Sequence, residues 1–389
     1  MAYTRGGTLT RIDYGMTAST VYAGTAPEQI VFTVGERCLP SGATCDDTHF
    51  TTANASWWPD VPIDQNCAQG ASCTTHGPTF WSRKQLNSIT TQIQVNGATQ
   101  QVDRYDFVHS FPDGGDHAPT LWLDSVQHTG LDTGAGASGS VSTPVTSFDP
   151  PAQLANRVGT IANQPVMYHD RIQNITTETG ARVTVTYNPT QCTPANVPTD
   201  PSTNTLPCFP VLWTPPGATS PQADWFHKYT VHSVLTQDLH ETNQDGTYPE
   251  LLTTYAYDGG AGWHYDDNEL VKPANRTYGQ FRGYATVETR TGDTTVFHTT
   301  NGAKVNDQLT LNKTSYFRGM SNNTPTGTGG STVTLTSTDG AHTAQDTNAL
   351  LGQVFETDAY TGDGGTIDHA TVTIPTIIGP TASRNRTGL

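Results

Sequence analysis

Short runs of alternating apolar and polar residues dominate the chain. In residues 181–187, two valines and a tyrosine alternate with arginine and threonine, which predicts a strand with one polar face. Residues 88–107 place Ile89, Ile93 and Val95 on one face and continue into Asn-Gly, a strong signal for a two-residue hairpin turn. Further strand candidates are residues 28–36, 224–239, 251–259, 281–290, 293–300, 331–338 and 369–378. We therefore predict an all-β fold, a long antiparallel strand meander or ribbon of hairpins.

Helical patterns are few and short. Residues 151–158 and 343–355 are the segments expected to be helical. The second has Ala344, Leu350 and Leu351 at roughly helical spacing and Asp346 as a possible cap. Residues 129–151 and 193–207 are rich in Gly, Pro, Ser and Thr, which is typical of connections between strands. We expect two parts, an N-terminal β segment over residues 1–150 and a second β segment over residues 151–389.

A short pattern recurs four times in about 150 residues. An apolar residue, any residue, Ser or Asn, and then Ile or Val begins at Leu86, Leu123, Ile172 and Val231. The starts lie 37, 49 and 59 residues apart, which is too irregular for a propeller or a strict solenoid. A degenerate repeat within a strand meander, with connections of different lengths, tolerates this variation.

The third copy belongs to a longer motif in residues 168–187, YHDRIQNITTETGARVTVTY. Gly180 can adopt positive φ at the turn, and the tyrosines and β-branched residues favour cross-strand pairs. A Tyr-x-Tyr-Asp sequence occurs again at Tyr255, Tyr257 and Asp258. These features resemble the Rhs/YD-repeat family. The positions of the first motif that match the YD repeat are Tyr168, Asp170, Arg171, Ile172, Asn174, Ile175, Thr176, Gly180 and Tyr187.

Other segments extend this resemblance to about residues 11–389. They are similar to the region that precedes the regular YD repeats in large secreted Rhs proteins of actinobacteria, and FRGYATVET is also similar to a segment of the B component of bacterial Tc toxins. The segments are residues 37–45, 57–67, 103–113, 120–130, 224–231, 257–267, 281–290 and 316–320.

The resemblance implies a hollow shell. In this family a long β ribbon spirals around a C-terminal toxin domain, which is released later. The aspartyl self-cleavage segment and the toxin domain that follow the shell are not recognised in this sequence. We therefore expect shell material from a longer secreted protein, with the remaining polypeptide, other copies joined through sheet edges, or an enclosed toxin domain as partners.

Charge and hydropathy restrict the partners. Only 14% of the residues are charged, compared with roughly 25% in ordinary globular proteins. Nineteen Lys and Arg against 35 Asp and Glu give a net charge of -16, which repels a phosphate backbone. We expect no nucleic-acid partner. The mean hydropathy of -0.47 and the lack of an apolar run near 18 residues predict no membrane-spanning helix.

Six cysteines fall into three local pairs, Cys38 with Cys45, Cys67 with Cys73, and Cys192 with Cys208. Short loops closed by disulfides are typical of secreted proteins, and we expect an extracellular location. Zinc sites prefer the tighter Cys-x-x-Cys spacing, so metal binding is disfavoured, and some cysteines remaining as buried thiols is the third alternative. The first ten residues lack the apolar core of a signal peptide, which favours a segment cut from a longer chain.

Catalytic motifs are weak. Ser138 in GAGASGS does not meet the Gly-x-Ser-x-Gly pattern, and the thirteen histidines form no His-Glu-x-x-His motif. Residues 263–269 (WHYDDNE) are either an acidic loop or a site for a cation or a sugar, and Asp358, Asp363 and Asp368 present a similar choice between a turn and a cation site. We expect no enzymatic activity, metal or cofactor.

Two arginines and six tryptophans complete the candidates. Arg282 and Arg318 each precede a glycine next to aromatic residues, where stacking or hydrogen bonding to the backbone is expected. The predicted function is a non-enzymatic shell or scaffold segment, and the alternatives are a fibre-forming adhesive protein and a carbohydrate-binding or carbohydrate-active module. The last alternative depends on Trp57, Trp58, Trp81, Trp122, Trp225 and Trp263.

Overall fold

Most of the chain is defined in the computed structural model. It describes residues 6–39, 44–67, 70–72, 79–132, 139–240, 242, 250–292, 297–306, 308–379 and 381–383. The chain folds into two compact units. Unit 1 comprises Met1–Gln153 and Asp170–Arg182, and unit 2 comprises Leu154–His169 and Val183–Leu389. The expected division after residue 150 stays a prediction.

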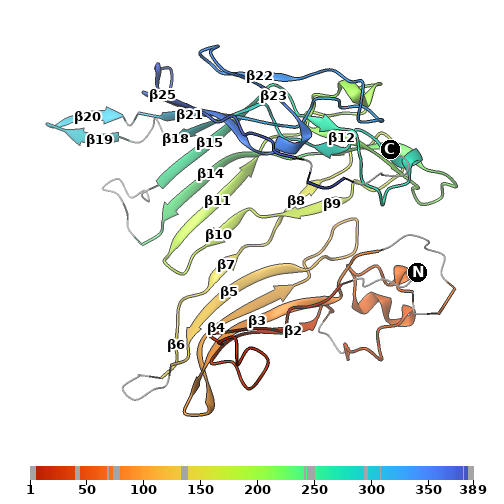
Figure 1. Cartoon of the computed structure of the whole chain (residues 1–389), viewed down its shortest axis with the longest axis vertical. Coiled ribbons are helices and arrows are strands. Elements are labelled where there is room, and N and C mark those ends of the chain that lie inside the picture. The colour runs from red at the N-terminus through yellow and green to blue at the C-terminus, as the bar shows by residue number, and fades with distance from the viewer. Residues whose placement is uncertain are drawn as a thin grey trace. The chain divides into compact units, whose positions relative to one another are not determined.

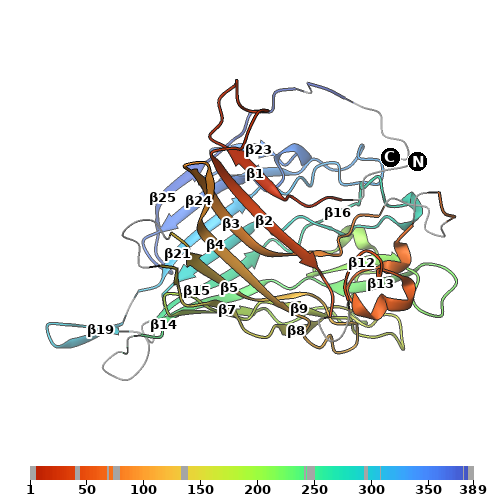
Figure 2. The same cartoon turned by 90° about the horizontal axis from the view of Figure 1, so that it is seen from below.

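A 15-stranded antiparallel sheet confirms the all-β fold (Figure 1). Its neighbouring strands follow one another in chain order, as Figure 2 shows for β2 to β5. In sheet order the strands are β1 (Arg11–Tyr14), β2 (Glu28–Glu36), β3 (Lys84–Val95), β4 (Ala98–Ser110), β5 (Trp122–Gly130), β7 (Thr146–Phe148), β10 (Asn174–Thr176), β11 (Ala181–Tyr187), β14 (Val231–Asp238), β15 (Glu250–Asp258), β18 (Thr286–Thr291), β21 (Thr310–Tyr316), β24 (Val354–Tyr360) and β25 (Ile367–Val372). The short strand β6 (Val141–Ser142) pairs with β5 outside this order.

Five two-stranded hairpins are inserted between strands of this sheet. They pair β8 (Ala152–Ala155) with β9 (Tyr168–Arg171), β12 (Cys208–Trp213) with β13 (Gln222–His227), β16 (Trp263–His264) with β17 (Gln280–Phe281), β19 (Phe297–Thr300) with β20 (Ala303–Asn306), and β22 (Thr334–Thr336) with β23 (Thr343–Gln345). Short 3-10 helices are η1 (Thr52–Trp57), η2 (Ile63–Gln65), η3 (Pro201–Thr203), η4 (Pro273–Asn275) and η5 (Asn348–Leu350). No helix of the described residues is long and apolar enough to cross a membrane.

Both predicted helices are wrong. Residues 151–158 contain strand β8, because the backbone N–H groups of Asn156 and Arg157 donate to the carbonyl of Val166 instead of closing helical turns. Residues 343–355 form β23, the single turn η5 and the start of β24. Helix propensity is a weak prior, and pairing with neighbouring strands overrides it in both places.

The four copies of the repeated pattern lie on β3, β5 and β14 and at the start of β10, and these are every second strand in this part of the sheet. In the first two copies, Ser88 and Ser125 occupy the same place in the pattern. On β4, Asp106 lies opposite Ser88 on one side and Gln127 on the other. The second copy is therefore displaced by two residues along the sheet relative to the first.

The same displacement occurs between the second and third copies. Ser147 of β7 lies opposite Ser125 on one side and Thr176 on the other, and Thr176 is two residues beyond the equivalent Asn174. An even displacement keeps all these residues on one face of the sheet. A constant stagger of this kind accompanies tilted strands in curved sheets and barrels.

Apolar packing among the described residues is divided into small groups, two of them in unit 2 and one in unit 1, where Phe50 packs edge-on against the buried Trp58. In unit 2, one cluster contains the Cys192–Cys208 disulfide and Trp225, with Val158, Val197 and Leu206 packed against it. The other contains Phe317, Leu350 and Phe355, with Leu335, Ala344 and Val372 around it. Burial of these side chains stabilises the inserted segments, whereas most strand residues of the main sheet are only half-buried.

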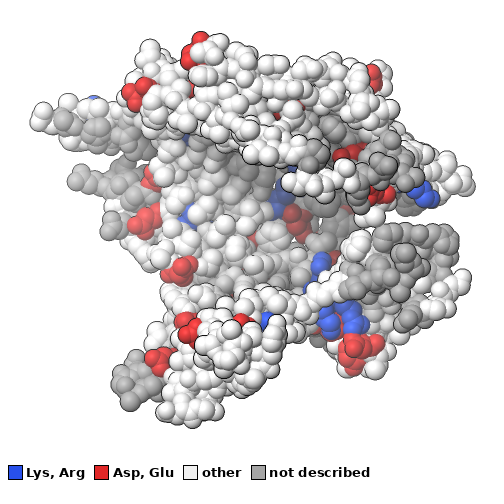
Figure 3. Space-filling view, viewed as in Figure 1, with Lys and Arg blue, Asp and Glu red and all other residues white. Residues whose placement is uncertain are grey.

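Charged groups are sparse on the face seen in Figure 3. Glu288 of β18 pairs across strands with Lys313 of β21 and along its own strand with Arg290. The hydrogen bond from Lys313 lowers the pKa of Glu288, and the same bond raises the pKa of Lys313. The pair therefore remains ionised near neutral pH and joins two strands.

Two disulfides are present among the described residues, Cys38–Cys45 and Cys192–Cys208. Cys67 is also disulfide-bonded, and its expected partner Cys73 lies outside the described residues. Both complete pairs match the local pairing expected from the sequence. Of these two bonds, Cys192–Cys208 belongs to an apolar cluster of the described residues.

Removal of the Cys192–Cys208 bond tests its contribution to stability. The two cysteines are 16 residues apart, so replacing both by alanine should lower the free energy of unfolding by about 3 kcal/mol. Chemical denaturation under oxidising conditions measures this change. The matched double variant at Cys38 and Cys45, seven residues apart, should lose about 2 kcal/mol or less. An equal or larger loss in the control would contradict a special role of the buried bond.

Candidate functional site

Three segments of the sequence resemblance, residues 257–267, 281–290 and 316–320, meet in unit 2. Strands β15 and β21 both run antiparallel to β18, so the chain leaves β15 and β21 at the same end of the sheet. There the N–H of Gly262 donates to the carbonyl of Gly283, and the N–H of Arg282 donates to the carbonyl of Gly262, both at 2.8 Å. This reciprocal pair joins the first two segments.

Asp346 holds the third segment. Its side chain is fully buried and accepts the backbone N–H groups of Arg318, Gly319 and Met320 at 2.8, 2.6 and 3.1 Å. Gly319 has φ of +67°, and a Cβ there would lie 2.9 Å from the Cα of Asn348, so the turn requires glycine. Asp346 does not cap a helix as the sequence suggested, because its carboxylate shapes the Arg-Gly-Met turn instead.

The two arginines bind polar groups of neighbouring segments. Arg318 donates from Nη1 to the carbonyl of Gly260 at 3.2 Å. Arg282 donates from Nη1 to Oδ1 of Asn348 at 2.7 Å and from Nη2 to Oε1 of Gln280 at 3.0 Å. Burial lowers the pKa of both guanidinium groups, and the carboxylate of Asp346 opposes this shift. The arginines therefore crosslink the segments rather than face solvent.

His264 is held in one orientation next to these arginines. It is 7% exposed, and Nδ1–H donates to the carbonyl of Tyr265 at 2.7 Å. Burial lowers the pKa of the imidazole, and the charge of Arg282 lowers it further, although the bond to Tyr265 and the charge of Asp267 oppose the shift. The ring is therefore neutral near pH 7, with Nε2 as an acceptor.

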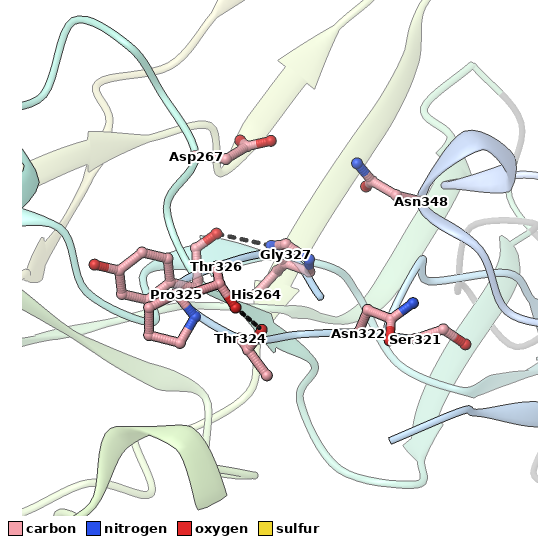
Figure 4. A pocket seen from close by; sticks show the side chains of 10 residues that line it. His264, Asp267, Ser321, Asn322, Thr324, Pro325, Thr326, Gly327 and Asn348 are labelled. Atoms are coloured by element: carbon pink, nitrogen blue, oxygen red, sulfur yellow. Dashed lines mark hydrogen bonds between the residues drawn. The ribbon is translucent and has the colours of Figure 1, made fainter. Parts of the chain in front are cut away.

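A polar pocket of about 140 Å³ lies beside His264 (Figure 4). Its wall combines residues around β16 with residues 321–327 and with Asn348 of η5. The segment 321–327 is fixed to β16 by Asn323, which donates from Nδ2 to the carbonyl of Trp263 and accepts from the N–H of Tyr265, both at 2.8 Å. This pocket is the candidate functional site.

Comparisons with known proteins give one match. No family model and no curated protein matches the chain. The crystal structure of TcdB2-TccC3-TEV is similar with 14% sequence identity and a TM-score of 0.24, over 71% of this chain and 14% of that chain. The present chain thus spans about one seventh of the length of that protein.

The YD-motif residues are not among the described residues that line the pocket. Tyr168, Asp170 and Arg171 are on β9, which pairs with β8, whereas Asn174, Ile175 and Thr176 are on β10 of the main sheet, and Ile172 lies between the two strands. Gly180 has φ of +85° in the turn before β11, where Tyr187 is the last residue. Tyr255, Tyr257 and Asp258 are on β15. The first motif therefore contains a hairpin, but its Tyr-x-Asp head belongs to a different sheet.

The other sequence candidates separate into two groups. His264, Tyr265 and Asp267 of residues 263–269 line the pocket. Asp358 is buried beneath Thr338, and Asp363 pairs with Arg290, so these carboxylates serve different contacts. No group of three or more metal-ligating side chains is assembled among the described residues. Ser138 lies outside the described residues.

Tryptophans do not form an exposed sugar-binding platform. Trp58, Trp225 and Trp263 are buried. Trp57, Trp81 and Trp122 are half-buried.

The sequence did not indicate two parts of the site, Asn348 and the segment 321–327. They join it through hydrogen bonds between residues about 60 positions apart in the chain.

Loss of the Asp346 carboxylate should destabilise the turn formed by Arg318, Gly319 and Met320. Asp346→Ala leaves three backbone N–H groups without their acceptor, and we expect the free energy of unfolding to fall by about 3 kcal/mol or more. Urea denaturation provides the measurement. The control is Asp64→Ala, an exposed residue of η2 whose loss should leave stability nearly unchanged. Similar midpoints for the two variants would refute the anchoring role.

The protonation of His264 tests the geometry of the pocket. In the folded protein its pKa should lie below the ordinary value of 6.5, because burial disfavours the imidazolium. The folded state then binds fewer protons than the unfolded state, so this histidine's contribution to stability is complete above pH 6.5 and is lost as the pH falls through the folded pKa. NMR titration should show this low pKa and an Nδ1–H tautomer, and His264→Gln should reduce the loss of stability on acidification. A folded-state pKa at or above the ordinary value would contradict the buried, neutral ring.

Proposed function

We propose that this chain is a non-enzymatic structural segment of a secreted Rhs/YD-repeat protein. It would form part of a β shell or scaffold that encloses or delivers a toxin domain outside this chain. The observation that carries the proposal is the order of the sheet, in which fourteen strands pair as successive neighbours along the chain. Such a ribbon grows by addition of strands and builds a wall instead of a closed core.

The register supports a curved wall. Successive copies of the repeated pattern are displaced by two residues from β3 to β5 and again from β5 to β10. A displacement that accumulates in one direction tilts the strands, which is the geometry that lets a sheet curve. Half-buried strand residues agree with a single layer that has two accessible faces.

The disulfides support secretion. Cys38–Cys45 and Cys192–Cys208 each close a short loop, and such bonds form and persist in oxidising compartments. The low charged fraction and the many Thr and Asn residues suit long strands that are exposed to solvent on both faces. These features favour a structural role in an extracellular protein.

The outer edge of β25 is the proposed joint to further polypeptide. This strand ends the sheet, and among the described residues no strand pairs with its outer side. The N–H of Thr373 donates to the carbonyl of Phe355, so by alternation Thr371 also points its N–H inward, whereas Ala370 and Val372 point theirs outward. An extended segment could therefore add to this edge through backbone hydrogen bonds.

Proline substitutions distinguish the two sides of β25. Ala370→Pro removes an outward N–H and should leave the melting temperature nearly unchanged, while reducing self-association or pairing with an added strand at least tenfold. Thr371→Pro removes an inward N–H and should lower the free energy of unfolding by about 1–3 kcal/mol. Sedimentation at increasing concentration and moderate salt, which screens the net negative charge, measures the association.

Hydrogen exchange supplies the decisive control. In the monomer, the amides of Ala370 and Val372 should exchange quickly and that of Thr371 slowly. A monomer in which both kinds of amide are protected would show that the edge is covered and would end the proposal of a joint there. Electron microscopy separates the two structural roles, because regular filaments would favour the fibre-forming alternative, whereas hollow or irregular curved particles would favour a shell.

A further inference from the structure

The proposed role as part of a β shell does not require the pocket beside His264. The polar groups of this pocket are nevertheless held in position by hydrogen bonds. Its volume of about 140 Å³ has room for about ten water molecules. Figure 4 shows that Asp267 and Asn348 reach it from elements other than the segment that carries Thr324 and Thr326. A pocket built from three separate segments, each held by hydrogen bonds, has the preformed character of a ligand site.

Asn348 supplies a donor that is fixed in position. Its Oδ1 accepts from Nη1 of Arg282, which fixes the amide so that its NH₂ group is the free end. The side chain is exposed and lines the pocket, so this NH₂ group is available to a ligand oxygen. Arg282 directs Nη1 to Asn348 and Nη2 to Gln280 and is not among the described residues that line the pocket, so the pocket wall offers no guanidinium to an anion.

His264 and two threonines supply acceptors, while the exposed Asn322 lines the pocket with an amide that both donates and accepts. The proton of the His264 ring is committed to the carbonyl of Tyr265, which leaves the lone pair of Nε2. The hydroxyls of Thr324 and Thr326 both donate to the carbonyl of Thr328, at 2.9 and 3.0 Å, so their oxygens present lone pairs. A ligand that satisfies such a wall must itself bring several O–H donors.

The charge of the pocket wall and of the chain further restricts the class of ligand. Asp267 is the charged residue that lines the pocket, and a net charge of -16 on the chain adds to its effect. Both disfavour carboxylated or phosphorylated ligands. Tyr265 adds an aromatic wall and is held edge-on against Tyr278, with the ring centres 5.3 Å apart.

We infer that this pocket binds a neutral polyhydroxylated ligand of about the size of one monosaccharide, with Asn348 as donor and His264, Thr324 and Thr326 as acceptors. The site is independent of the tryptophans that suggested a carbohydrate module in the sequence. It is also independent of the β25 edge, so it goes beyond the structural role proposed above. A wall segment with this site would attach to one exposed sugar at a time.

NMR titration of the whole chain with neutral hexoses and N-acetylhexosamines tests the inference. At least one of these sugars should saturate shifts at His264, Thr326 and Asn348 with a Kd in the millimolar range, as expected for a few hydrogen bonds. Glucuronate and an aliphatic ammonium ion are the charged competitors. Binding of either more tightly than every neutral sugar, or no saturation by any neutral sugar, would overturn the assignment.

Matched threonine variants locate the binding. Thr326→Val keeps the shape of an exposed pocket residue but removes its acceptor oxygen, and it should raise the Kd about fivefold. Thr336→Val makes the same change on the exposed face of β22, away from the pocket, and should leave the Kd unchanged. Equal effects of the two variants would refute a site in this pocket, even if the chain bound sugar elsewhere.

Discussion

Each peptide group within a strand needs a hydrogen-bond partner, and in the main sheet the next strand of that sheet along the chain supplies it. Because pairing follows chain order, a strand closes its ladder as soon as its neighbour folds, without waiting for distant segments. Among the described residues, the buried apolar side chains form small separate groups in both units and do not run along the whole sheet. The backbone ladder therefore carries a larger share of the stability than it does in a sandwich with a continuous core.

Inserted segments require a different kind of support, because their backbone does not pair with the main sheet. Two fully buried aspartates provide it in unit 2. Asp224 binds the guanidinium of Arg157 and also accepts from Thr160 and from Nε1 of Trp213, which ties residues 157–160 to the β12–β13 hairpin. Asp346 binds three successive N–H groups of the Arg-Gly-Met turn. A buried carboxylate with several donors fixes a turn more sharply than apolar contacts do, because each bond has a required direction.

Local signals in the sequence predicted the parts of the fold that depend on neighbouring residues. Alternation gave β2 its observed bounds, and the Asn-Gly turn after Val95 joins β3 to β4. Helical spacing failed at residues 343–355, where Asp346 is drawn into contact with a turn 26 to 28 residues earlier. The candidate site was found only in part for the same reason. Its acidic-aromatic segment stands out in the sequence, but Asn348 acquires its role through Arg282, 66 residues away.

The irregular spacing of the repeated pattern has a structural cause. From Leu86 to Leu123 the chain forms β4 and one connection, and the spacing is 37 residues. From Leu123 to Ile172 it also forms the β8–β9 hairpin, and from Ile172 to Val231 it forms the β12–β13 hairpin, which lengthen the spacing to 49 and 59 residues. The copies are thus regularly placed in the sheet, where one copy occurs on every second strand. Only their spacing in the sequence is irregular. Insertions are tolerated at the connections because closing a longer loop costs little free energy. The ladder can then remain constant while the inserted hairpins acquire buried carboxylates and a polar pocket.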